Sequence, residues 1–312
     1  MRLQKPSQIG FGKPTGDGRG EVNTFTSTRT KGAPVALYGG TASLWFEPKS
    51  HSYQVRENGE TRRVPSVTQI LRIVDKSEPL TQWAANCAAE LLSQRLRPGQ
   101  ALDELGISNL ANEIRFNFRR VSDRAKNIGK LAHAWIEDLL RRRMTGEPGE
   151  PPLPVNAEAR RACLAARDWL AAHHFQPLAA EQMIYSRAHG YAGTLDVAAT
   201  ASIDGRFSVI DWKTSAAIYP EYRLQLAAYV QALAEMEPLP LADRWIVRLG
   251  KDDGAFKAIH IGSHEQERDF RDFLTAKALH EGITEIRQGA SARESARAGK
   301  CNVKEPISEV IT

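Results

Sequence analysis

The sequence predicts an α/β fold in which a central mixed β-sheet is flanked by helices. Short segments that alternate apolar and polar residues, the pattern of half-buried strands, occur near the start of the chain, at its centre and beyond residue 243. Longer stretches between them repeat apolar residues every three to four positions, which is typical of amphipathic helices. This interleaving favours helices packed on a sheet.

The composition is that of a globular protein with a sizeable core, since 42% of its 312 residues are hydrophobic. A formal net charge of +5 is compatible with a polyanionic partner but supports nucleic acid only weakly. Cys87, Cys163 and Cys301 form no C-x-x-C pair, so disulfides are not expected and a reducing compartment fits. No apolar run has the length of a signal peptide or a membrane span, so we expect a cytoplasmic protein without a membrane partner.

The chain divides into three parts by composition. Residues 1–34 are rich in Gly, Ser, Thr and basic residues, so we expect a mobile basic N-terminal segment. Residues 288–312 lose apolar periodicity, so we expect a mobile C-terminal tail. Residues 35–287 form one domain, with a hairpin and helical part at 35–175 and the core at 176–287.

A hairpin and a helix start are predicted early in this domain. Asn58-Gly59 stands between strand-like runs and favours a type I′ turn. Ser66 is followed three residues later by Gln69, the spacing of a capping box, so a helix should begin after Ser66.

Three further helices are predicted before the central strands. Helical periodicity covers 80–96, about 101–143 and 157–174, with a break at Pro98-Gly99 and a candidate cap at Asn156. After the centre, two strands within 243–262 and a final helix at about 264–287 complete the domain.

Two central segments, 190–196 and 209–214, alternate with a period of two and should form neighbouring strands. Gly205 supplies a turn between them, so an antiparallel hairpin is the economical connection. Asp196 and Asp211 then lie on adjacent strands.

Residues two apart on a strand share a face, so Asp211 and Lys213 point the same way while Trp212 points into the packing. Two converging carboxylates repel each other unless a divalent cation neutralises them. Mg²⁺ prefers oxygen ligands, and two carboxylates, a backbone carbonyl at Trp212 and a substrate phosphate form a suitable set. Lys213 could orient the attacking water and counter the charge that develops on the phosphate, so phosphodiester hydrolysis is the predicted reaction.

This pattern resembles the PD-(D/E)XK nuclease superfamily, with Asp196 as the first acid and Asp211-Trp-Lys213 as the second motif. The first motif here is Gly-Thr-Leu-Asp and contains no proline. Together with Gln225-x-x-x-Tyr229, the motifs are similar to the RecB-type exonuclease branch, which includes phage recombination nucleases and a mitochondrial genome-maintenance exonuclease. The resemblance covers roughly residues 45 to 280 and implies a restriction-endonuclease-like core with an N-terminal hairpin and helical additions.

The resemblance also implies further site residues. His133, in a Gly-x-x-x-His setting on a helix, becomes a metal ligand, although a lone helical histidine is usually a half-buried polar group. Glu181 could bind the metal or a metal-bound water, or form a salt bridge instead. Gln225 and Tyr229, with Tyr222 on the same helical face, could contact the substrate backbone or support Lys213.

Basic residues cluster on the helix that leads to His133. Arg115 and Arg119 are the candidate phosphate contacts, and a solvated helix face is the alternative. Arg120, Arg124 and Lys126 lie in the same stretch.

The predicted function is a metal-dependent DNA exonuclease that uses Mg²⁺, with Mn²⁺ as a substitute. The resemblance suggests phage or bacterial DNA recombination and repair, with recombination or single-strand-binding proteins as partners. A structure-specific endonuclease and a catalytically idle nucleic-acid-binding module are the alternatives. Three cysteines are too few for a four-cysteine iron–sulfur cluster, and Gly10–Gly16 fits no phosphate-loop pattern, so neither a cluster nor an ATP site is expected.

Overall fold

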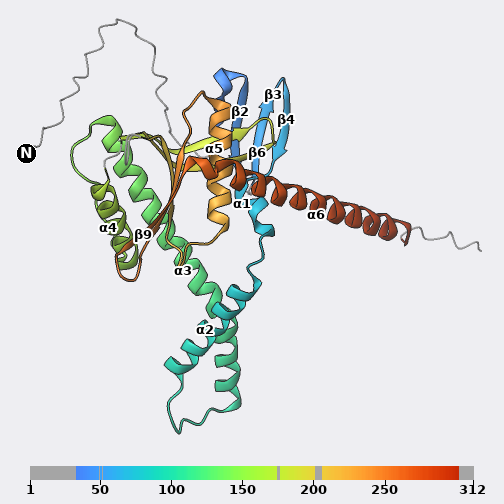
Figure 1. The fold of residues 1–312 in the computed structure, drawn as a ribbon. Helices are drawn as coiled ribbons and strands as arrows, with labels where there is room; N and C mark the ends of the chain where they lie inside the picture. The colour runs from blue at the N-terminus through green and yellow to red at the C-terminus, as the bar shows by residue number, and fades with distance from the viewer. Residues whose placement is uncertain (1–32, 49, 51, 174–175, 201–205, 302–312) are drawn as a thin grey trace, which may run out of the picture.

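The computed structural model describes residues 33–301, apart from 49, 51, 174–175 and 201–205 (Figure 1). Outside this part lie most of the basic N-terminal segment predicted at residues 1–34, the predicted turn residue Gly205 and the last eleven residues, 302–312. The described chain forms a four-stranded sheet, β1-β2-β3-β4, and a five-stranded sheet, β5-β6-β7-β8-β9. No helix within it has both the length and the apolar character that crossing a membrane requires.

The N-terminal sheet is larger than the predicted hairpin. Its strands run antiparallel: β1 (Val35–Leu37), β2 (Ala42–Glu47), β3 (Ser52–Glu57) and β4 (Glu60–Val64). The turn at Asn58-Gly59 has positive φ at both residues, 51° and 83°, as a type I′ turn requires. The additional strands form because Leu37 and Leu44 turn inward and pack with Tyr185 of the second sheet. Burial against another sheet is a tertiary effect that local propensity does not reveal.

The capping box at Ser66 forms as predicted, with the Ser66 side chain accepting from the Gln69 amide and the Gln69 side chain accepting from the Ser66 amide. The helix that it starts is a single turn, α1 (Val67–Ile70), followed by the 3-10 turn η2 (Leu71–Ile73). The expected longer helices follow as α2 (Ser77–Arg95), α3 (Glu104–Thr145) and α4 (Ala157–Ala172), which Asn156 caps.

Helix α2 and the first half of α3 project from the body of the molecule as a helical hairpin, which we call the arm (α2 with residues 104–127 of α3; Figure 1). Only Cys87 and Leu91 are buried among the arm residues, whereas α3 buries side chains from Ile128 onward. The second half of α3 is therefore the part anchored in the core.

The five-stranded sheet is mixed, as predicted. Its strands are β5 (Gln176–Ser186), β6 (Tyr191–Thr200), β7 (Ser208–Lys213), β8 (Asp243–Leu249) and β9 (Phe256–Ile261). Neighbours are antiparallel except β7 and β8, which are parallel and are connected through helix α5 (Glu221–Met236). This crossover puts α5 on one face of the sheet, beside the end of β7.

Helices cover both faces of this sheet, and β7 contributes alternate side chains to the two cores. Val209 packs with α5 and with α6 (Gln266–Cys301) on one face. Ile210 and Trp212 pack with α3 and α4 on the other. The predicted α/β fold with a mixed sheet between helices is confirmed.

Helix α6 continues well past its predicted end at residue 287, to Cys301. Its last part projects from the body (Figure 1). Apolar periodicity marks the helix face that packs on a core, so a projecting segment does not require it. The sequence there is rich in alanine and also holds arginine and lysine, which are strong helix formers without packing. The absence of periodicity therefore did not mean the absence of a helix.

Candidate active site

The site is built on the end of β7, the central strand of the five-stranded sheet. Asp211 is 1% exposed, and its Oδ2 lies 2.6 Å from Nζ of Lys213, two residues along the same face. Trp212, between them, points to the opposite face and packs edge-on against Trp169 of α4. The alternation expected from a period of two is confirmed, and it brings a carboxylate and an ammonium together.

Helix α5 holds Lys213 through a series of hydrogen bonds. Nζ of Lys213 donates to Oε1 of Gln225 at 3.1 Å, and Nε2 of Gln225 donates to the hydroxyl of Tyr229 at 2.9 Å. Gln225 and Tyr229 are buried, with 8% and 4% exposure. Their positions match the predicted alternative in which the pair supports Lys213, while a direct contact with substrate stays a prediction.

Tyr222 adds a second restraint on the same ammonium. Nζ of Lys213 lies 4.6 Å from the centroid of the Tyr222 ring, within the range of a cation–π interaction. Burial raises the pKa of the Tyr222 hydroxyl above its ordinary value, which already keeps the hydroxyl protonated at physiological pH. The face of α5 that carries Tyr222, Gln225 and Tyr229 is thus turned toward Lys213.

The other two predicted carboxylates lie on neighbouring strands at the same level. The β6–β7 ladder joins Val197 to Ile210, and the next step along both strands is Asp196 and Asp211. The β5–β6 ladder joins Ala180 to Val197 and Gln182 to Leu195, which sets Glu181 opposite Asp196. The side chains of Asp196 and Glu181 lie outside the described part of the structure.

An irregularity in β5 determines the position of Glu181. The register shifts by one residue between Pro177 and Ala179. Without this bulge Glu181 would pair with Leu195, and a shift of one residue exchanges the two faces of a strand. The bulge therefore sets Glu181 level with Asp196, while Asp196 and Asp211 each follow the last paired residues of the β6–β7 ladder.

His133 lies on α3 and is half-buried. One turn earlier, a Cβ on Gly129 would lie 3.0 Å from Oγ1 of Thr214, the residue after Lys213. The glycine thus lets α3 approach the end of β7 closely, and residues four apart share a helix face. The close approach therefore turns the face of α3 that carries both Gly129 and His133 toward the end of β7.

Arg115 and Arg119 are exposed on the arm, more than three turns before His133 on α3. They lie away from the Lys213 cluster, and their predicted contact with substrate phosphates stays a prediction.

Two contacts at the site were not foreseen from the sequence. Glu221, at the start of α5, is 6% exposed and its Oε1 lies 2.5 Å from Nζ of Lys76, just before α2. This ion pair joins the root of the arm to the helix that holds Lys213. The two residues are far apart in the chain, so no local pattern could reveal it. The approach of Gly129 to Thr214 is the second, and the glycine was its only sequence signal.

The donor set fits a hard divalent cation. Asp211 brings a buried carboxylate, the register adds Asp196 and Glu181 at the same level, and the Trp212 carbonyl lies between Asp211 and Lys213. Oxygen donors of this kind suit Mg²⁺, and a histidine ligand would also accept Mn²⁺. Among the side chains that the structure describes, no group of three or more His, Cys, Asp or Glu residues converges.

Gly193, in the Gly-Thr-Leu-Asp motif, is predicted to be essential for packing. A Cβ at this position would lie 2.7 Å from Cε1 of Tyr229, so the ring must shift. Gly193→Ala is expected to cost about 1–3 kcal/mol of unfolding free energy, as overpacked core substitutions do. The shift would also displace the hydroxyl that receives the Gln225 hydrogen bond. Urea denaturation followed by circular dichroism measures the loss, and Gly282→Ala, where a Cβ meets nothing within 4 Å, is the control.

Equal stability of wild type and Gly193→Ala would show that Tyr229 can move without cost.

The comparison with known proteins agrees with this geometry. The family model of the PD-(D/E)XK nuclease superfamily matches residues 109–305, which include both acidic motifs and the helices that flank them. No curated protein matches the chain. The match spans well over half of the chain, and the chain belongs to the PD-(D/E)XK nuclease superfamily.

Proposed function

We propose that this protein is a Mg²⁺-dependent DNA exonuclease, with Mn²⁺ as a substitute metal. Membership of the superfamily implies a metal-dependent nuclease. The observation that carries the proposal is the restrained Lys213, which contacts Asp211, Gln225 and the Tyr222 ring at once. An idle binding module has no need of an ammonium held in this way, so a working site is the better explanation.

Each residue has a role in the proposed reaction. Asp196, Asp211, His133 and the Trp212 carbonyl would hold the metal, with Glu181 as a further ligand or a contact to a metal-bound water. Bound metal supplies Lewis-acid polarisation of the phosphate and a water of lowered pKa. Lys213 would orient the attacking water and neutralise charge that develops on the phosphate oxygens.

Gln225 and Tyr229 act on the reaction through Lys213. A half-buried lysine side chain has several rotamers, and the acceptor Oε1 of Gln225 selects one of them. Tyr229 in turn fixes the Gln225 amide.

The exonuclease assignment and the biological setting rest on the similarity of the motif set to the RecB-type branch. We propose a role in phage or bacterial DNA recombination and repair, inside the cytoplasm. Recombination or single-strand-binding proteins are the partners that such a role would require. A structure-specific endonuclease with the same site residues is the alternative.

The test is cleavage of end-labelled linear DNA and covalently closed circular DNA, in Mg²⁺, in Mn²⁺ and in EDTA. We expect metal-dependent loss of the linear substrate and survival of the circle. Cutting of the circle would instead support the endonuclease alternative.

Asp211→Asn, purified in the same way, is the control for contaminating nucleases. This substitution keeps the shape of the side chain and removes the charge that would hold the metal. If the variant degrades DNA as fast as wild type, the activity does not come from this site. If neither protein cleaves any substrate, the nuclease proposal fails.

A further inference from the structure

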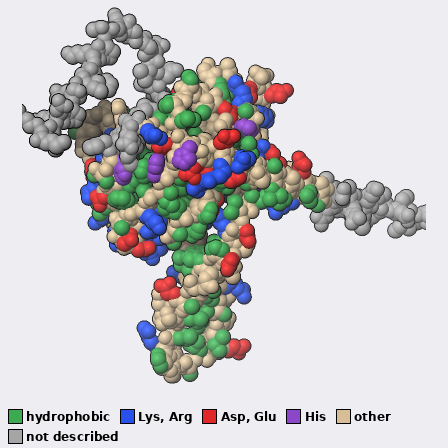
Figure 2. Space-filling model, viewed as in Figure 1, with side chains coloured by type: hydrophobic (Ala, Val, Ile, Leu, Met, Phe, Trp, Pro, Cys, Tyr) green, Lys and Arg blue, Asp and Glu red, His purple; other side chains and the backbone are tan. Residues whose placement is uncertain are grey.

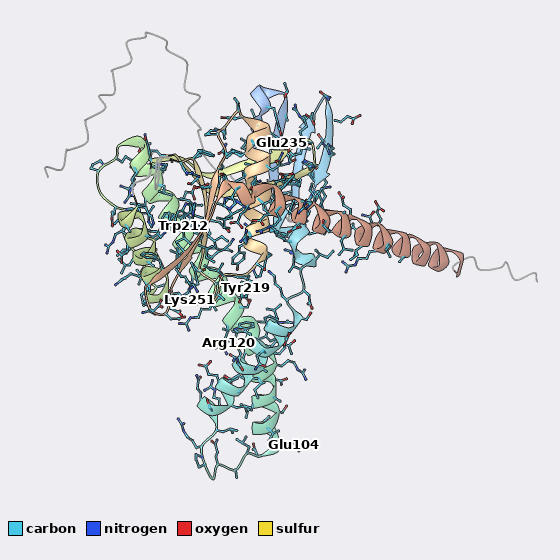
Figure 3. The ribbon with its side chains drawn as sticks, in the orientation of Figure 1. Glu104, Arg120, Trp212, Tyr219, Glu235 and Lys251 are labelled. Carbon is cyan, nitrogen blue, oxygen red and sulfur yellow. The ribbon has the colours of Figure 1, made fainter. Side chains whose placement is uncertain are left out.

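The first half of α3 presents a basic and aromatic face that the packing of the fold does not use. In the arm, α2 packs on one side of α3, where Asn117 donates to the Cys87 carbonyl and Arg95 pairs with Glu113. Figure 3 places Glu104 at the far end of the arm and Arg120 nearer the body. The side of α3 turned away from α2 is open to solvent among the described residues.

The basic residues of α3 divide between these two sides. Arg120 and Arg124 lie on the side of α2, where Arg120 is 4.0 Å from Glu113 and Arg124 is 2.6 Å from Glu158. Arg115 and Arg119 lie on the open side, and no carboxylate of the described chain pairs with either. Lys126, also on the open side, has an exposed contact with Asp123 at 3.1 Å, and such pairs contribute little.

The open side leads to the candidate active site. Helices have 3.6 residues per turn, so Lys126 lies about three turns and His133 about five turns after Arg115, on the same face. At about 1.5 Å per residue, Arg115 and His133 are roughly 27 Å apart along the axis. Arg115, Arg119 and Lys126 thus lie on the face of α3 that also carries His133, one turn after the glycine that approaches Thr214.

Exposed aromatic rings flank this row. Phe116 is 47% exposed and Phe118 is 37% exposed, and the guanidinium of Arg119 lies 5.8 Å from the centroid of each ring. Figure 2 shows hydrophobic side chains along the surface of the arm. Exposed apolar side chains that gather on a projecting element are typical of a binding surface.

We propose that single-stranded DNA binds along this face of α3, with Arg115, Arg119 and Lys126 on its phosphates and Phe116 and Phe118 against its bases. Positive charge with interleaved aromatic rings is the chemistry that holds single strands. The phosphates of duplex DNA could contact the basic residues equally well. Its bases could not contact the phenylalanine rings, because they are already stacked on each other. The inference deepens the proposed nuclease function by naming the substrate: an unpaired strand that reaches the site along α3.

The experiment measures binding of the full-length protein in EDTA, where no cleavage occurs. The probes are a fluorescein-labelled oligothymidine of about 20 nucleotides and a duplex of equal length. Both exceed the roughly eight nucleotides that span 27 Å at duplex spacing, and an extended single strand needs fewer. Fluorescence anisotropy at several salt concentrations gives the dissociation constants and their salt dependence.

Three pairs of substitutions test the two kinds of contact. Phe116→Ala with Phe118→Ala should weaken single-strand binding by roughly 5- to 150-fold for each stacked base and leave duplex binding nearly unchanged. Phe116→Leu with Phe118→Leu, which keeps apolar bulk without an aromatic face, should weaken it as well. Arg115→Gln with Arg119→Gln should lower the slope of log K against log salt by about 1.4, or 0.7 per phosphate contact.

The matched control is Arg120→Gln with Arg124→Gln, which removes the same charge from the other side of the same helix. Thermal unfolding checks that all variants are folded. The proposal is overturned if the phenylalanine variants bind the single strand as wild type does, or if the control pair weakens binding as much as Arg115→Gln with Arg119→Gln. It is also overturned if wild type is a dimer that the alanine variants dissociate, since the face would then join copies of this chain.

This test is separate from that of the nuclease activity. Single-strand binding that depends on Phe116 and Phe118, without cleavage in Mg²⁺, would support the strand-binding face and refute the nuclease proposal. Cleavage in Mg²⁺ by a protein whose single-strand binding is unchanged by these substitutions would support the nuclease proposal and refute the strand-binding face.

Discussion

Lys213→Ala is expected to lower the rate of metal-dependent cleavage by about 10²- to 10³-fold, the usual effect of removing one preorganised group that stabilises transition-state charge. Asp211, Gln225 and the Tyr222 ring hold the ammonium in place. The free energy needed to reorient it is therefore small when charge develops on the phosphate. DNA binding should change much less, because the phosphates of a bound strand meet many other positive groups.

Single-turnover cleavage of end-labelled DNA, with enzyme in excess, separates this chemical effect from binding. Lys257→Ala is the matched control, since it removes the same charge from an exposed position on the edge strand β9. The rates are compared at a temperature where both proteins are folded, because the substitution also leaves the buried Asp211 carboxylate without the ammonium beside it. Cleavage by Lys213→Ala at the wild-type rate would remove Lys213 from the mechanism.

Trp212→Ala is expected to cost about 3–5 kcal/mol of unfolding free energy, as truncation of a fully buried aromatic residue does. Trp212 is 1% exposed, and its ring meets that of Trp169 at an interplanar angle of 88° and a centroid distance of 5.1 Å. Removal of the ring leaves a cavity between β7 and α4. The backbone carbonyl, which is the predicted metal ligand at this position, remains.

Urea denaturation followed by circular dichroism measures this loss. Trp212→Phe is the graded control: it keeps an aromatic ring against Trp169 and should lose less than half as much. A cost of less than about 1 kcal/mol for Trp212→Ala would mean that the surrounding side chains close the cavity, which large buried truncations rarely permit.

The arrangement within each element was predictable, because it follows from local geometry. A period of two predicts that Asp211 and Lys213 share a face and that Trp212 is buried, and this is confirmed. The turn of a helix likewise aligns Gln225 with Tyr229, and they are hydrogen-bonded. These relations depend only on residues a few positions apart.

The contacts between elements were harder to predict. The sequence left open whether Gln225 faces substrate or Lys213, because the answer depends on how the crossover places α5 against β7. The alignment of Glu181 with Asp196 depends on a bulge near Pro177, which no alternation pattern reveals. The N-terminal sheet and the Lys76–Glu221 ion pair also depend on residues that are distant in the chain.

The central position of β7 affects which parts of the molecule open by local unfolding. The strand is hydrogen-bonded to β6 on one side and to β8 on the other, and it lies between two cores. Its backbone can open only when the whole domain unfolds, whereas the arm, which buries little more than Cys87 and Leu91, can fray at a much lower free energy. Amide protons of Val209 and Ile210, which are paired on both sides, should therefore be among the slowest in the described chain to exchange with solvent, and those of α2 among the fastest. The proposed catalytic groups would then lie on a rigid strand, and the segment that reaches into solvent would be free to adapt its shape.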